Sequence, residues 1–188
     1  MNSRLRKDFL NVRFLTFLAL GLFFLAHPSY AKTAREIDAK VDASLSRFER
    51  EIFGAQDMIK RCKGVLVFPK VYKGGIGIGA EYGEGALRIN GKNVDYYNII
   101  SGSIGFQFGG QVKTIFLFFM EDSALREFRA SSGWKVGVDG SVALISVGAA
   151  GSIVTMKTNE PILAVILDQK GLMYNLTIEG SKINKIVK

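Results

Sequence analysis

After Lys63 the sequence breaks into short runs of β-branched and aromatic residues separated by glycine and other turn residues. Runs of this kind, bounded by turn residues, predict β-strands. Asn90-Gly91 and Asp139-Gly140 are residue pairs favoured in two-residue hairpin turns, because both positions of such turns need positive φ angles. The predicted strands are residues 65–68, 76–82, 86–89, 94–100, 104–108, 112–120, 136–138, 141–147, 153–156, 161–167 and 172–178.

A helical pattern precedes these strands. Apolar or small residues recur every three or four positions between Ile37 and Cys62, which is the spacing of one face of an amphipathic helix. Thr33 followed by Glu36 fits a capping box and predicts the start of this helix. Gly54 weakens its middle and is a point where it can divide in two. A shorter helix is predicted over residues 123–132, ended by a glycine.

This order of elements predicts an α+β fold. We expect a mostly antiparallel β-sheet or sandwich, covered by a long N-terminal amphipathic helix, with one short later helix. Gly75, Gly77 and Gly79 alternate, so they leave one face of a strand bare for close approach by another backbone. The same segment fits the G-x-G-x-x-A nucleotide fingerprint, but that fingerprint must open a helix. Strand residues follow here, so nucleotide binding is not expected.

The first 31 residues have the features of an export signal. Four basic residues precede an apolar run at positions 14–26, and Ser29 and Ala31 supply the small residues of a cleavage site. A membrane anchor is the alternative, but cleavage is favoured, since 13 residues span roughly 20 Å of a hydrocarbon core about 30 Å thick. We expect residues 1–31 to be removed and residues 32–188 to form a single domain in the periplasm.

Two composition features limit the chemistry of that domain. The chain's only histidine, His27, lies in the predicted signal, so triads and zinc sites that need histidine are excluded after cleavage. The single cysteine, Cys62, excludes an internal disulfide and is predicted to be a buried small hydrophobe. We expect no catalytic site, no metal and no cofactor. An enzyme using carboxylate pairs is the alternative, for instance Glu81 with Glu84, or Glu121 with Asp122.

Basic residues concentrate between positions 60 and 73, where no acidic residue occurs, within a chain of formal net charge +8. If the helix end and the first strand lie side by side, these cations form a patch that binds anionic headgroups, each contributing about 1 kcal/mol. A solvated basic face is the alternative. Nucleic acid is not an expected partner of an exported protein. The predicted headgroup contacts are Lys60, Arg61, Lys63, Lys70 and Lys73.

The apolar face of the long helix has two interpretations. It covers the sheet, or it inserts into the interface of a bilayer. For insertion, the candidate residues are Phe48, Ile52 and Phe53.

Several blocks of sequence resemble the SYLF domain family, in order and over most of residues 37–183. The blocks are CKGVLVFPK at 62–70, GGIG at 74–77, YGEG at 82–85, YYN at 96–98, GSIGFQ at 102–107, FR at 128–129, GW at 133–134, GVDGS at 137–141 and GLMYN at 171–175. The resemblance implies lipid binding. Eukaryotic members bind phosphoinositide membranes through basic residues and an amphipathic N-terminal helix, a yeast branch binds actin, and bacterial members are exported.

From the resemblance and the basic stretch we expect an exported, non-enzymatic protein that docks peripherally on anionic phospholipid membranes. Actin is not expected as a partner of an exported chain. Two alternatives remain open at this point. One is a small outer-membrane β-barrel, for which about 150 residues suffice. The other is a module that binds a protein partner of the cell envelope.

Overall fold

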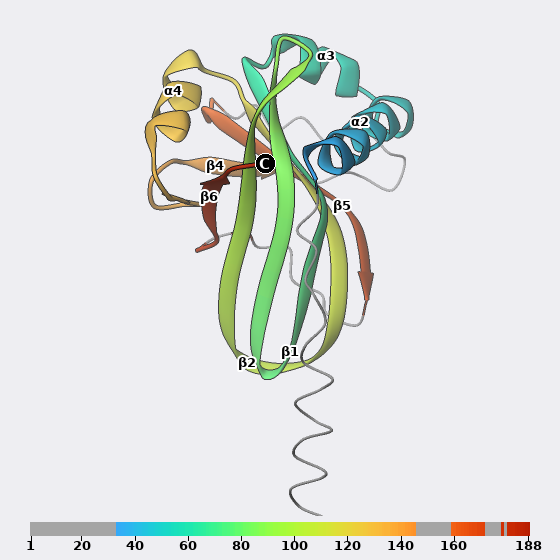
Figure 1. Ribbon diagram of the computed structural model, residues 1–188, viewed down its shortest axis with the longest axis vertical. Coiled ribbons are helices and arrows are strands. Elements are labelled where there is room, and N and C mark those ends of the chain that lie inside the picture. Colours follow the sequence, from blue (N-terminus) through green and yellow to red (C-terminus); the bar gives the residue numbers. More distant parts are fainter. Residues whose placement is uncertain (1–32, 146–158, 172–177, 179) are drawn as a thin grey trace, which may run out of the picture. The chain divides into compact units, whose positions relative to one another are not determined.

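The computed structural model describes residues 33–145, 159–171, 178 and 180–188. These residues form an α+β fold with a curled, mixed six-stranded sheet (Figure 1). The predicted signal and the predicted strand at 153–156 lie outside the described residues, as does most of the strand predicted at 172–178. The helices are α2 (Ala34–Glu51), α3 (Ala55–Arg61) and α4 (Asp122–Ala130), and the strands are β1 (Gly64–Ile89), β2 (Lys92–Phe119), β3 (Trp134–Lys135), β4 (Val142–Ile145), β5 (Ile162–Gly171) and β6 (Lys182–Ile186).

The predicted N-terminal helix divides at Gly54. Helix α2 begins at the Thr33 cap, whose hydroxyl accepts a hydrogen bond from the Glu36 amide at 3.3 Å. Gly54 has a left-handed conformation, with φ of 87°, and α3 begins immediately after it. Glycine adopts this conformation without the steric cost that a side chain imposes. The break therefore follows from the residue that weakened the helical pattern in the sequence.

Strands β1 and β2 form one very long antiparallel hairpin, and its turn was predicted. Asn90 and Gly91 have φ of 49° and 75°, as a two-residue hairpin turn requires. The breaks predicted within this region are wrong, because β1 and β2 are each continuous. Pro69 and the glycines that follow it accompany bulges and a bend in the ribbon and do not end the strand. Figure 1 shows both strands running down and returning, so that the ribbon folds over on itself.

Two glycines allow the halves of β1 to meet. A Cβ atom placed on Gly85 would lie 1.9 Å from the carbonyl oxygen of Val67, and one on Gly83 would lie 2.8 Å from the Val71 side chain. Neither distance is possible for real atoms, so only glycine fits at these crossings. The sequence predicted a close approach at Gly75, Gly77 and Gly79, and the crossings at Gly83 and Gly85 were missed.

The hydrophobic core has two parts, one on each face of the sheet. On one face, helix α2 buries the side chains of Ile37, Val41, Leu45 and Phe48 against the sheet. Phe48 packs between two aromatic residues of β2, with ring centroids 4.8 Å from Phe116 and 5.4 Å from Phe118. Burying each of these side chains stabilises the fold by roughly 1.5–3 kcal/mol. Helix α2 is therefore held firmly on the sheet.

The other face of the sheet is covered by α4. Phe128 of α4 lies 4.9 Å from Tyr97 and from Phe119, and 5.5 Å from Trp134, between ring centroids. The predicted later helix is confirmed, with Leu125 and Phe128 buried. The hairpin turn predicted at Asp139-Gly140 is wrong. Gly137 takes the positive φ, and the Asp139 carboxylate instead accepts a hydrogen bond from the Lys135 amide.

The sheet is mixed because one strand pair is parallel. Strand β1 pairs with β2, β2 with β5 and β6, and β3 with β6, all antiparallel, whereas β4 pairs with β5 in parallel. Order along the sheet is β3-β6-β2-β5-β4, with β1 also on β2. This arrangement places α2, α3 and the hairpin turn close together at the upper end of Figure 1.

Candidate functional site

Three of the five predicted cations gather where α3 ends and β1 begins. Lys60, Arg61 and Lys63 are exposed, and we call them the α3 patch. Lys60 and Lys63 line one surface hollow, together with Arg88 and the hairpin turn at Asn90-Gly91. The three cations are close because the chain passes directly from the short helix into the strand. The predicted adjacency of helix end and first strand is thus observed for these three residues.

The ion pairs of the α3 patch are weak and exposed. Arg61 lies 3.6 Å from Asp57, and Lys63 lies 3.6 Å from Asp122. Exposed pairs of this kind contribute about 0–1 kcal/mol, because water and salt screen the charges. Among the described residues, Lys60 makes no ion pair. The cations of the patch therefore remain available to an anionic ligand.

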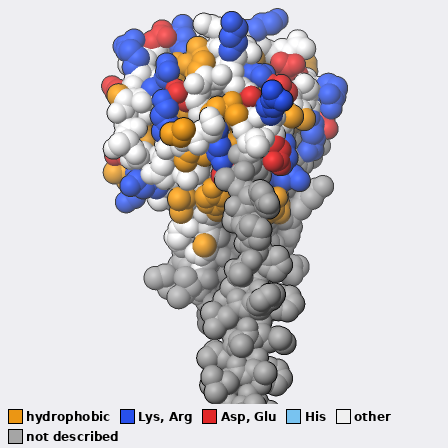
Figure 2. Space-filling model, in the orientation of Figure 1, with side chains coloured by type: hydrophobic (Ala, Val, Ile, Leu, Met, Phe, Trp, Pro, Cys, Tyr) orange, Lys and Arg blue, Asp and Glu red, His pale blue; other side chains and the backbone are white. Residues whose placement is uncertain are grey.

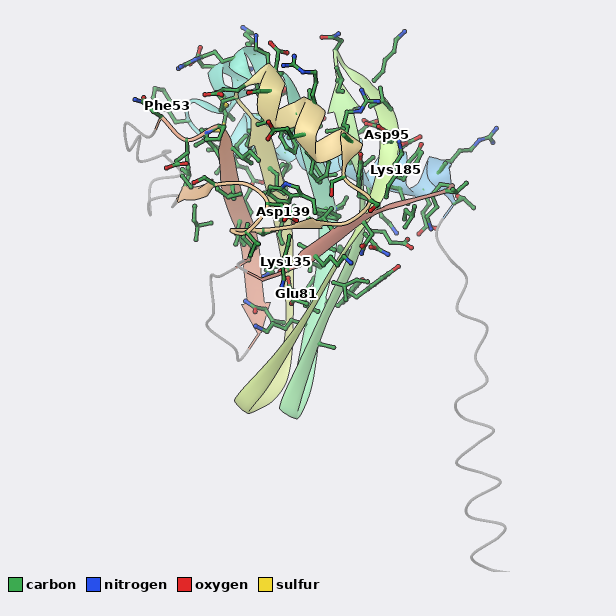
Figure 3. The ribbon with its side chains drawn as sticks, turned by 90° about the vertical axis from the view of Figure 1, so that its left-hand side faces the viewer. Phe53, Glu81, Asp95, Lys135, Asp139 and Lys185 are labelled. Atoms are coloured by element: carbon green, nitrogen blue, oxygen red, sulfur yellow. The ribbon has the colours of Figure 1, made fainter. Side chains whose placement is uncertain are left out.

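Phe53 is the large apolar side chain beside this patch. It is 83% exposed, although phenylalanine is usually buried. Phe53 sits in the break between α2 and α3, and it lines a second hollow together with Lys60. In Figure 3, Phe53 lies at an outer edge of the molecule, away from Lys135 and Lys185. The local charge is mixed, because Glu49 and Asp57 line the same hollow.

The prediction that Phe48 and Ile52 insert into a membrane does not fit the structure. Phe48 is fully buried, and Ile52 is 7% exposed. Both belong to the core between α2 and the sheet, so moving them into a bilayer would first require the helix to leave the sheet. Of the three apolar candidates, only Phe53 is on the surface.

The remaining two predicted cations are not part of the α3 patch. Lys73 is only 7% exposed, so its side chain is not a surface cation. Lys70 is exposed but lies further along β1, where it lines a groove with Lys40 and Arg47 of α2. The single patch predicted from residues 60–73 is therefore wrong, since strand β1 carries Lys70 and Lys73 away from α3.

A buried ion pair lies inside the folded ribbon, and sequence reasoning missed it. Lys113 Nζ and Glu81 Oε1 are 3.0 Å apart, with side-chain exposures of 0% and 2%. Neither atom makes a hydrogen bond with the described residues, and the amide of the buried Gln111 is likewise unpaired there. The sequence signal that could have revealed this pair is the position of Lys113 and Glu81 within apolar strand segments. Desolvated charges of this kind are costly unless paired.

The carboxylates considered for an enzyme have separate partners. Glu81 pairs with Lys113, whereas Glu84 lies 3.0 Å from Lys188 and accepts a hydrogen bond from Tyr82. Burial, followed by the Glu84 carboxylate, raises the pKa of Tyr82 to about 12. Positions 81 and 84 fall on opposite faces of a strand.

The second carboxylate pair lies at the start of α4. Glu121 accepts a hydrogen bond from Ser123, and Asp122 pairs with Lys63. Each acidic residue therefore has its own partner at the start of α4, although the Glu121 side chain makes no capping hydrogen bond to the helix backbone.

Cys62 is half-buried, and its thiol donates to the carbonyl oxygen of Ile59 at 3.2 Å. Burial raises the pKa of this thiol, against the lowering effect of backbone hydrogen bonds from Gly64 and Cys62. A raised pKa keeps the thiol protonated and unreactive at neutral pH. This fits the predicted role as a small hydrophobe.

The described part of the chain contains no helix long and apolar enough to cross a membrane. Nor do the described residues group three metal-binding side chains from His, Cys, Asp and Glu. Figure 2 shows basic and acidic side chains interspersed over the upper part of the molecule, with apolar side chains between them. This surface is suited to contacts that combine charge with limited apolar burial.

Comparison with known proteins identifies a family for part of the chain. The family model described as Ysc84, Las17-binding protein actin regulator, matches residues 100–186. The matched segment contains most of β2 and all of α4, β3, β4, β5 and β6. No curated protein matches the chain.

Proposed function

We propose that the chain is an exported lipid-binding protein, since residues 100–186 match the Ysc84 family model and the sequence resembles the SYLF domain family. It docks peripherally on anionic phospholipid membranes through the α3 patch and Phe53. One observation carries this proposal: a phenylalanine that is 83% exposed shares a surface hollow with Lys60. Cations that attract anionic headgroups, next to an aromatic side chain that enters the interface, are the usual elements of peripheral membrane binding.

The mode of docking differs from insertion of a whole helix. The apolar face of α2 is buried in the core. Within the helical segment from Ala34 to Arg61, the exposed break between α2 and α3 is therefore the part that enters the bilayer interface. The family description names Las17 binding and actin regulation. We favour a membrane over actin because the N-terminal segment has the pattern of an export signal, and an envelope compartment offers anionic lipid.

Vesicle flotation tests this proposal. We expect the protein to float with phosphatidylglycerol vesicles and not with phosphatidylcholine vesicles. Binding should fade with salt, because exposed charges are screened over about 10 Å at 0.1 M. The variant Lys60→Gln/Arg61→Gln/Lys63→Gln removes three cations worth about 1 kcal/mol each near an anionic surface. It should bind on the order of 100-fold more weakly.

The matched control is Lys135→Gln/Lys182→Gln/Lys185→Gln, which removes the same charge from β3 and β6. Lys135 and Lys182 are paired in the strand register, and Lys185 follows on β6. This variant should bind as the unmodified protein does, apart from a small effect of net charge. Equal weakening of both variants would refute the assignment to the α3 patch. Release by detergent but not by salt would refute peripheral docking.

Export is part of the proposal and has its own test. The mass of the protein recovered from expressing cells should correspond to a chain that begins at Lys32, after cleavage behind Ala31. Recovery of an uncleaved chain in the cytoplasm would contradict it.

A further inference from the structure

Buried polar side chains gather on one face of the β1–β2 ribbon. Lys73 and Gln111 are directly opposite in the register of the two strands, so their side chains project from the same face. Lys113 lies two positions after Gln111 on β2 and shares that face. All three residues are buried, whereas the neighbouring Tyr72 and Gly110 are exposed. This alternation shows that the shared face is turned toward the interior.

The second half of β1 lies across this face. Lys113 Nζ is 3.0 Å from Glu81 Oε1, and a Cβ atom on Gly83 would meet the Val71 side chain at 2.8 Å. Val71 is the register partner of Lys113, so both contacts join the same two layers. Gly79 lies two positions before Glu81, is buried and has no side chain. The facing layer therefore leaves room for a small ligand beside the polar side chains.

The donor groups of this interior lack hydrogen-bond acceptors among the described residues. Lys113 Nζ contacts Glu81 without forming a hydrogen bond, and both amide atoms of Gln111 are unpaired. Lys73 makes no ion pair within residues 33–145, 159–171, 178 and 180–188. Buried polar groups in proteins are nearly all satisfied, so groups of this kind indicate a water molecule or an ion at the same place.

The charges favour an anion over water alone. The described side chains of this interior carry two ammonium groups, on Lys73 and Lys113, and one carboxylate, on Glu81. A buried charge without a counter-charge is costly, and a water molecule does not supply one. The two lysines are diagonal neighbours across the strand pair, at roughly 7–8 Å, which is within reach of long side chains. Ammonium and amide N–H groups are all donors, as an anion requires.

We propose that the interior of the folded ribbon binds a small monovalent inorganic anion of the halide class. The ion accepts hydrogen bonds from the ammonium groups of Lys73 and Lys113 and from the amide NH₂ of Gln111. Lys113 keeps its contact with Glu81 at the same time, because an ammonium group has three donors. The close contact of the two layers at Gly83 restricts the ligand to a small ion. This site is independent of membrane docking, since its residues are buried.

Urea denaturation of the purified protein in two sodium salts tests the proposal. Chloride is the probe, and gluconate at equal concentration screens surface charges but is too large for the site. A ligand that binds only the folded protein stabilises it in proportion to its saturation. We expect chloride to lower the unfolding equilibrium constant about tenfold relative to gluconate, once its concentration is about ten times the dissociation constant. Equal stability in the two salts up to molar concentration would overturn the proposal.

Three variants assign the effect to these side chains. Lys73→Met and Gln111→Leu each remove a donor and should raise the chloride dissociation constant about tenfold or more, as for the loss of a hydrogen bond to a charged group. Lys70→Met is the matched control, because it removes the same charge from an exposed position on the same strand, and it should keep the full chloride effect. The difference between the two salts is independent of any change in baseline stability. A chloride effect that survives both Lys73→Met and Gln111→Leu would overturn the site.

Crystals of the unmodified protein grown in bromide locate the ion without any substitution. We expect an anomalous scattering peak within hydrogen-bond distance of Lys113 Nζ and of the Gln111 amide nitrogen. A water molecule at that place without an anomalous signal, or bromide peaks confined to the surface, would contradict the proposal.

Discussion

Tyr97 is a core residue whose hydroxyl group has no hydrogen-bond partner among the described residues. Tyr97 is 2% exposed, and its ring packs against that of Phe128 at a tilt of 40°. Burial, followed by the charge of Asp95 and opposed by that of Arg129, raises the pKa of Tyr97 from 10.0 to about 12. The unpaired hydroxyl therefore lowers stability, and burial of the aromatic ring offsets this loss.

Replacing this hydroxyl should stabilise the protein. An unpaired buried polar group costs about 1–3 kcal/mol, so Tyr97→Phe should raise the free energy of unfolding at pH 7 by about 1 kcal/mol. Urea denaturation gives the value. A loss of stability would show that the hydroxyl has a bonding partner.

The same residue contributes to alkaline unfolding. A folded-state pKa above the unfolded one means that the contribution to stability is fully present below pH 10.0 and is lost as the pH rises through about 12. Between these values, Tyr97→Phe should lose less stability than the unmodified protein. Parallel denaturation curves at pH 9 and pH 11 check the difference, and equal losses would contradict the raised pKa.

At the scale of elements, the folded β1 strand depends on glycine at its crossing points. A side chain at Gly85 would meet the Val67 carbonyl oxygen at 1.9 Å, so the backbone would have to move. Gly85→Ala should lower the free energy of unfolding by about 3 kcal/mol or more. Gly102→Ala is the matched control, since no atom lies within 4 Å of its added Cβ. It should change stability by no more than about 0.5 kcal/mol. Similar values for the two variants would mean that the halves of β1 are not in contact.

The buried ion pair of the ribbon gives a second test at this scale. Lys113→Met leaves Glu81 without its partner in the interior and should cost about 3–5 kcal/mol. Adding Glu81→Leu removes the stranded charge, so the double variant should recover most of that loss. Urea denaturation of Lys113→Met, Glu81→Leu and the double variant completes the double-mutant cycle. A double variant no more stable than Lys113→Met would indicate that packing, and not charge, sets the cost.

Elements set by short-range chemistry could be predicted from the sequence. The Thr33 cap, the turn at Asn90-Gly91 and the helix carrying Phe128 depend on a few neighbouring residues, and all three are observed. The strand boundaries could not be predicted in the same way. Pro69 is a turn signal in sequence, but in the structure it lies in a bulge of a continuous strand. Whether Pro69 ends the strand or lies in a bulge is decided by pairing with β2 residues more than forty positions away.

At the scale of the whole molecule, the candidate site was predicted in part. Lys60, Arg61 and Lys63 are adjacent in sequence and stay together on the surface. The sequence predicts Lys73 as a surface cation, but Lys73 is 7% exposed, and its burial depends on how the ribbon folds back. Phe48 and Phe53 look alike in the helical pattern, but the sheet covers one and leaves the other exposed. The groove at Lys70 is formed by α2 together with the β-bulge between Phe68 and Val71. No local sequence pattern predicts it, because these segments are far apart in the chain.

In the proposed docking mode, the break between α2 and α3 enters the interface of an anionic membrane. Phe53→Trp places a fluorescent side chain at that point. The only native tryptophan, Trp134, is 3% exposed and provides a constant background. Val138→Trp is the control, because Val138 is 70% exposed but lies in the turn after β3, apart from the α3 patch.

The deciding measurement is the emission spectrum of the Phe53→Trp protein with vesicles. We expect a shift to shorter wavelength with phosphatidylglycerol vesicles and no shift with phosphatidylcholine vesicles, because the side chain leaves water only where the cations are attracted. The Val138→Trp protein should show no shift with either. An unchanged Phe53→Trp spectrum under conditions where the protein floats would contradict insertion of this break, and it would place the membrane contact on another face.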